Sequence, residues 1–156
     1  MSTSIASNRQ RGRVVVVEHG VDIHRSPEEV FDYCSDPTHE PEWNPKLRRV
    51  TKLTDGPDGV GTRYEMEFVP GDPMRVECVR FERPTAWATV GDSRRLKAYF
   101  AGRVRATNDG AHLVMRMELL PQGLLGFAAP LLRRYMKGQV ERDVTTIKAM
   151  LEGRGQ

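Results

Sequence analysis

Little in this sequence is suited to metal or disulfide chemistry. It has two cysteines, Cys34 and Cys78, and four histidines, and none of these forms a CxxC motif or a pair at zinc spacing. A phosphate loop is also missing, because the glycine-containing turn at residues 56–61 is not followed by Lys-Ser or Lys-Thr. We therefore predict no metal and no cofactor, and we expect both cysteines to be packing residues.

The sequence also lacks a long hydrophobic run. The longest nearly apolar stretch, residues 123–132, is far shorter than the roughly 20 residues that span a bilayer, and Pro130 interrupts it. Residues 1–13 contain no apolar core of a secretory signal. These absences predict a cytoplasmic protein without stable membrane insertion.

No large excess of one charge is present either. The formal net charge is +3, and it comes from Arg9, Arg11 and Arg13 in a polar leader, residues 1–13, that we expect to be disordered. The rest of the chain has equal numbers of bases and acids. We therefore predict a single domain at residues 14–153 and no nucleic-acid partner.

What the sequence does contain is a regular order of secondary-structure signals. Residues 14–24 are rich in β-branched residues, which is typical of a strand. Ser26, Pro27 and Glu29 have the pattern of a capping box with proline in the first turn, and Asp36 can cap a second short helix. Six alternating segments separated by turn residues then predict antiparallel strands at residues 47–53, 62–68, 74–81, 85–91, 96–106 and 112–119.

Residues 123–153 form the longest helical pattern. Its apolar stripe consists of Met136, Val140, Val144, Ile147 and Leu151, and the polar residues on its far side include Gln139 and Asp143.

Upstream of the stripe, residues 124–135 are more apolar than one buried face requires, and Pro130 predicts a kink or loop. We nevertheless expect no contiguous apolar surface patch, and hence a monomer or weak dimer.

An α+β fold buries all of these apolar faces. It consists of a seven-stranded curved antiparallel sheet wrapped around a long C-terminal helix, with two short helices after the first strand. One helix cannot fill such a sheet, and the small residues Ala98 and Gly102 on the inner face of residues 96–106 are expected to leave room. The pattern therefore predicts an apolar cavity between sheet and helix.

Several short signatures resemble the START-like (SRPBCC) superfamily, and within it the polyketide cyclase/dehydrase group. They are SPEEVFDYCSDP after the first strand, WNP at residues 43–45, the DGPDGVGT turn, and the ending PLLRRYMKGQVERDVTTIKAMLEG. The resemblance covers about residues 14–153 and implies a helix-grip fold with a deep hydrophobic pocket. It also implies a lipid, sterol, polyketide or hormone ligand, and for some members the cyclisation or aromatisation of polyketides.

The candidate ligand-binding residues are large side chains expected near the inner face: Phe31, Trp43, Tyr64, Met66, Trp87, Phe100, Met115, Met117, Phe127 and Tyr135. If the protein is an enzyme, Tyr64 and Arg80 are the candidate catalytic residues, because a hydroxyl and a guanidinium can polarise a carbonyl. By strand register Arg80 shares a face with Val76 and Cys78, but it can equally lie at the rim or beyond a bulge.

Two functions stay open on this evidence. The first is a noncatalytic binding protein for a hydrophobic small molecule, since no acid/base constellation stands out on the apolar face. The second is an aromatic polyketide cyclase/dehydrase acting on a poly-β-ketone, which an acyl carrier protein would present. A chaperone-activating interaction module is disfavoured, because we expect no exposed apolar stripe for a partner.

Overall fold

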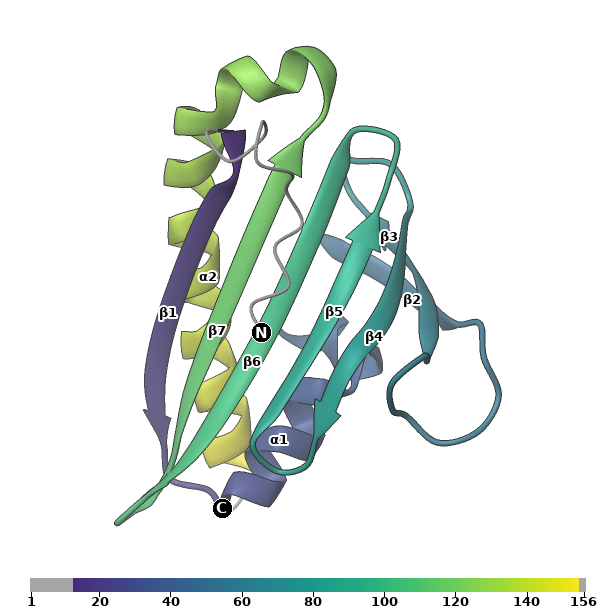
Figure 1. The fold of residues 1–156 in the computed structure, drawn as a ribbon. Coiled ribbons are helices and arrows are strands. Elements are labelled where there is room, and N and C mark those ends of the chain that lie inside the picture. Colours follow the sequence, from purple (N-terminus) through teal and green to yellow (C-terminus); the bar gives the residue numbers. More distant parts are fainter. Residues whose placement is uncertain (1–12, 155–156) are drawn as a thin grey trace.

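The computed structural model describes residues 13–154 and has the predicted α+β architecture (Figure 1). The predicted disordered leader lies outside the described residues except for Arg13. In chain order the elements are β1 (Val15–Ile23), α1 (Pro27–Ser35), the 3-10 helix η2 (Pro37–Glu42), β2 (Leu47–Lys52), β3 (Arg63–Phe68), β4 (Met74–Glu82), β5 (Ala86–Asp92), β6 (Leu96–Thr107), β7 (Gly110–Pro121), the 3-10 helix η3 (Gly123–Ala128) and α2 (Ala129–Gly153).

The seven strands form one curved sheet in the order β1-β7-β6-β5-β4-β3-β2, and every pair is antiparallel. The first strand therefore pairs with the last, and the others follow as a meander. Figure 1 shows α2 running along one face of this sheet. In the same view, α1 and η2 lie near the lower end of the sheet. This is the helix-grip arrangement, and the fold prediction is confirmed.

Local sequence explains where the helices begin. The Ser26 side chain accepts a hydrogen bond from the Glu29 amide at 3.3 Å, and the Ser26 amide donates to the Glu29 carboxylate at 3.0 Å, which completes the capping box. Asp36 caps η2 by accepting from the Thr38 amide at 2.9 Å. The break predicted near Pro130 is the junction between η3 and α2, so Pro130 lies in the first turn of α2.

A β-bulge in β4 decides which side chains of that strand reach the core. The register against β5 shifts between Cys78 and Arg80, so the alternation reverses and Phe81 takes the inward place. Phe81 and Trp87 then pack edge-on against the buried Phe31 ring, with centroid distances of 5.2 and 5.5 Å.

The space expected beside Gly102 is already filled. A Cβ built at Gly102 would lie 2.1 Å from the Trp87 indole, so Gly102 is small because it accommodates a core tryptophan. The expectation that Gly102 leaves room for a ligand is therefore wrong. Ala98 does line open space.

Candidate functional site

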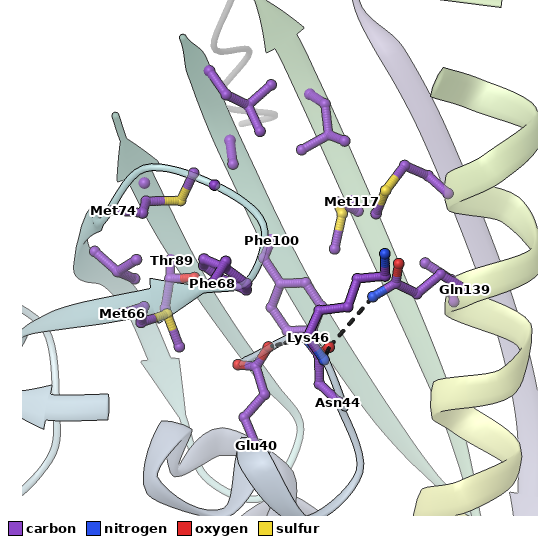
Figure 2. A pocket seen from close by; sticks show the side chains of 18 of the residues that line it. Glu40, Asn44, Lys46, Met66, Phe68, Met74, Thr89, Phe100, Met117 and Gln139 are labelled. Carbon is purple, nitrogen blue, oxygen red and sulfur yellow. Dashed lines mark hydrogen bonds between the residues drawn. The ribbon is translucent and has the colours of Figure 1, made fainter. Parts of the chain in front are cut away.

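A cavity of about 520 Å³ lies between the sheet and α2. Figure 2 shows side chains from η2, the strands and α2 converging on it. Its walls are mostly apolar, because the inward positions of alternating strands meet the apolar stripe of α2. The large apolar residues of these walls are Met66, Phe68, Met74, Trp87, Phe100, Met115, Met117, Tyr135 and Met136.

Seven of the ten predicted ligand-binding residues line this cavity: Trp43, Met66, Trp87, Phe100, Met115, Met117 and Tyr135. The structure does not bring the other three to it. Phe31 is fully buried against Phe81 and Trp87 as part of the core. Phe127 is 80% exposed on η3.

Tyr64, the third, is buried and does not belong to the lining of the cavity. Its hydroxyl donates to the Asp58 carboxylate at 2.5 Å, and burial together with this carboxylate raises the pKa of Tyr64. The hydroxyl therefore stays protonated and hydrogen-bonded to Asp58 of the β2–β3 connection.

Arg80 lies outside the cavity as well. The bulge in β4 turns it to solvent, where its guanidinium forms a bidentate pair with Glu82 at 2.9 and 2.7 Å. The structure thus places neither candidate catalytic side chain at the cavity.

One end of the cavity is polar, and its residues come from η2, the segment after it and α2. We call Glu40, Asn44, Gln139 and Asp143 the polar end. Asn44 is its centre: the Asn44 side-chain amide donates to Glu40 at 2.9 Å, and the Asn44 carbonyl oxygen accepts from the Gln139 amide at 3.3 Å (Figure 2). The Lys46 backbone amide also donates to this oxygen, at 3.2 Å, which fixes the orientation of Asn44.

The polar end keeps hydrogen-bonding capacity that the described residues do not use. Because Gln139 gives its NH₂ group to Asn44, its buried Oε1 has no partner, and the buried indole Nε1 of Trp43 has none either. Unpaired buried polar atoms are costly, so their presence beside a cavity marks a place for a polar group of a ligand.

The two carboxyl groups of the polar end are hard to ionise. Burial raises the pKa of Asp143 to about 7, and the neighbouring Arg142 charge only partly opposes this. Burial also raises the pKa of Glu40 to about 7; the hydrogen bond from Asn44 acts against the shift and the Asp143 charge adds to it. Near neutral pH these groups can therefore donate as well as accept a proton.

Sequence reasoning missed the polar end. Gln139 and Asp143 were expected on the solvent side of the last helix, yet each is only 7% exposed, so that expectation is wrong. Their four-residue spacing puts them on one helix face next to the apolar stripe, which is the signal that could have revealed them.

Part of the cavity lining is exposed at the junction of η3 and α2, where Leu125 and Tyr135 are each 43% exposed, and we take this as the opening of the cavity. Leu125, Leu132 and Tyr135 line it there, and the Lys46 ammonium lies 4.5 Å from the centre of the Tyr135 ring. Next to this opening, Leu124, Phe127 and Leu131 are strongly exposed. The prediction of a surface without an apolar patch is therefore wrong.

Fold and cavity together define a helix-grip protein with a mostly apolar site between the sheet and α2. The chain belongs to the family described as polyketide cyclase / dehydrase and lipid transport, whose model matches residues 14–152. A search of curated proteins found no match.

Solved structures with the same fold include two aromatase/cyclases. The Zhui aromatase/cyclase from Streptomyces sp. R1128 superposes with a TM-score of 0.76 at 14% identity, over 92% of this chain and 96% of that one. The di-domain aromatase/cyclase StfQ from the steffimycin biosynthetic pathway gives 0.75 at 16% identity, over 94% of this chain and 53% of that one, so this chain spans about half of StfQ. A START superfamily protein from Mycobacterium smegmatis gives 0.71 at 15% identity, over 88% of this chain and 97% of that one.

Among residues 13–154, no helix is long and apolar enough to cross a membrane. The same part of the chain contains no group of three or more His, Cys, Asp or Glu side chains that could hold a metal ion.

Proposed function

We propose that this protein binds a hydrophobic small molecule, lipid or polyketide-like, in the cavity between the sheet and α2. The observation that carries the proposal is a cavity of about 520 Å³ with mainly apolar walls and one polar end. Ligand sites of this size usually combine apolar walls with a few placed polar groups. The apolar body of the ligand would lie among the methionine and aromatic side chains, and a polar group would pair with Gln139 and Trp43.

Methionine-rich walls suit this role. Met66, Met74, Met115, Met117 and Met136 come from three strands and α2, and their unbranched side chains can adjust to ligands of different shape. Family membership and the fold support a small-molecule site, and they leave the ligand itself open.

A titration with a fluorescent fatty acid, cis-parinaric acid, and with a flavonoid tests this proposal. The decisive variant is Ala98→Trp, because Ala98 faces the cavity from β6 and an indole there would fill it. Its matched control is Ala106→Trp, the same change at an exposed position of the same strand. We expect saturable binding to the wild type and to the control, and loss of binding in Ala98→Trp. Equal binding by all three would place the probe outside the cavity and contradict the proposal.

The second candidate function is an aromatic polyketide cyclase/dehydrase, and the polar end is the observation that favours it. An ionised carboxylate can remove the α-proton of a β-ketone, while a protonated one donates its proton to the attacked carbonyl oxygen, so that a C–C bond forms. Loss of that hydroxyl together with a second α-proton, as water, then completes the dehydration. Glu40 and Asp143, both with a pKa of about 7, are the groups we propose for these roles.

Turnover of a carrier-bound poly-β-ketone separates the two functions. For the enzyme, Glu40→Gln and Asp143→Asn should each lower kcat at least about 100-fold and change ligand affinity only a few-fold. Tyr64→Phe and Arg80→Ala should keep kcat, because neither residue lines the cavity. If the wild type binds the poly-β-ketone tightly but does not turn it over, the enzyme function is contradicted and the binding function remains.

A further inference from the structure

The segment that lines the opening of the cavity also carries the most exposed large apolar side chains of the described chain. Leu124 is 85% exposed, Phe127 80% and Leu131 74%. All three belong to the segment formed by η3 and the first two turns of α2, residues 123–137, which we call the mouth segment. A folded protein rarely leaves neighbouring large apolar side chains in water unless another surface covers them.

The mouth segment stands at one end of the molecule. In Figure 1, η3 and the start of α2 rise beyond the end of β7, at the end opposite α1 and the C-terminus. Leu125, Leu132 and Tyr135 of the same segment line the cavity. Whatever covers the exposed side chains therefore lies against the entrance of the binding site.

The charge of this region has one sign. Residues 119–140 contain no aspartate or glutamate, and their charged residues are Arg133, Arg134 and Lys137. All three are exposed, and none is in an ion pair with another residue of 13–154.

Glu141, one helical turn beyond Lys137, is the next acid along α2, and a single carboxylate only partly offsets this excess. Arg13 adds a further cation, since its Cδ lies 3.6 Å from the place of a Cβ at Gly126. Asp72, which also lines the cavity, is already paired with Arg95, at 3.6 Å.

We propose that the mouth segment docks on the surface of a membrane that contains anionic lipids. Exposed leucine and phenylalanine side chains beside unpaired arginine and lysine are what an interfacial segment needs: the apolar side chains enter the acyl boundary and the cations meet lipid phosphates. Three protruding side chains present a few hundred Å², which is below the roughly 800 Å² per partner of a stable protein interface. Each can instead be buried separately in lipid. A hydrophobic ligand then moves between bilayer and cavity without crossing water.

Vesicle flotation tests the docking without any ligand. The full chain is mixed with vesicles of phosphatidylcholine alone or of equal parts phosphatidylcholine and phosphatidylglycerol. We expect flotation with the anionic vesicles, little with the neutral ones, and release at high salt, because the attraction is screened.

Two pairs of variants with matched controls separate the apolar from the electrostatic part. Leu124→Ser with Phe127→Ser should lower the partition coefficient at least about tenfold, while Leu53→Ser with Val60→Ser, exposed positions near the β2–β3 connection, should leave it unchanged. Arg133→Gln with Arg134→Gln should also lower it about tenfold or more, while Arg48→Gln with Arg63→Gln removes equal charge from exposed positions on β2 and β3 without effect.

Three results would overturn the proposal. They are no flotation of the wild type, equal flotation of the mouth variants and their controls, or a wild-type dimer in light scattering that Leu124→Ser with Phe127→Ser dissociates. Tight binding of a purified acidic carrier protein, lost in the mouth variants while vesicle binding is absent, would identify a protein partner instead. The cavity titration with cis-parinaric acid is done without vesicles, so its failure is distinct from failure of docking.

Discussion

Trp87 occupies the space that a side chain at Gly102 would take, and this makes Gly102 sensitive to the smallest substitution. A Cβ there would meet the Trp87 ring at 2.1 Å, and Trp87 is itself buried against Phe31. We expect Gly102→Ala to lower the free energy of unfolding by about 2 kcal/mol or more.

The matched control is Gly138→Ala in α2, where a Cβ meets nothing within 4 Å. There the same change should raise stability by about 0.5–1 kcal/mol, because alanine is the better helix former. Urea denaturation of both variants measures the two effects. Equal and small effects at both positions would contradict the packing described for Trp87.

The carboxyls of the polar end should make stability depend on pH. Their pKa values are raised by burial from 3.8 for Asp143 and 4.5 for Glu40 to about 7. Between about pH 4 and pH 7 the native state therefore keeps protons that the unfolded chain has lost. The free energy of unfolding should fall across this window as pH rises, by on the order of a few kcal/mol, and change little from this cause below it.

Asp143→Asn and Glu40→Gln should each reduce that fall, since neither replacement can ionise. Glu141→Gln, a carboxyl of the same helix outside the cavity lining, is the control and should retain it. Thermal unfolding measured from pH 4 to pH 8 checks this. A wild-type stability that rises with pH through the window and is unaffected by either substitution would show that these carboxyls are solvated.

At this scale the sequence predicted apolar positions better than polar ones. Met66, Phe100 and Met117 could be placed at the cavity because strand alternation fixes which face a side chain takes. Gln139 and Asp143 could not, because a polar residue next to an apolar helix stripe is usually solvated, and its burial here depends on η2 bringing Asn44 and Glu40 opposite.

Among the elements, α1 is the helix whose start is most clearly fixed by its own sequence. Ser26 and Glu29 satisfy each other's backbone amides, so Ser26→Ala should cost about 1 kcal/mol of unfolding free energy. Ser26→Asp, which keeps an acceptor at the cap, should cost less than half as much. Urea denaturation of the two variants measures this, and equal losses would show that the cap hydrogen bond is not what matters at this position.

Strand β4 shows what a pattern of alternation cannot reveal. Counting in twos from Val76 puts Arg80 on the inward face, and the sequence leaves a position beyond a bulge equally open. The structure has the bulge: one extra residue reverses the count, so that Phe81 points inward. The bulge depends on how β4 and β5 pair, and pairing is a property of the folded sheet.

For the whole molecule, the order of elements was predictable because each connection carries a turn or cap signal of its own. The seven strands, two short helices and long final helix follow from those signals, as does antiparallel pairing from the short connections. The exposure of the mouth segment was not predictable, because an apolar stretch of sequence is normally assigned to the core. Only the fold shows that α2 already covers the sheet and that Leu124 and Phe127 lie beyond it.

The central claim is that the cavity holds a ligand, and native mass spectrometry of protein purified from its own host, with organic extraction of whatever is bound, tests it most directly. We predict a stoichiometric hydrophobic molecule on the wild type and on Ala106→Trp, and an empty Ala98→Trp. A wild-type protein that carries nothing and also takes up neither cis-parinaric acid nor a flavonoid would contradict a ligand-binding cavity.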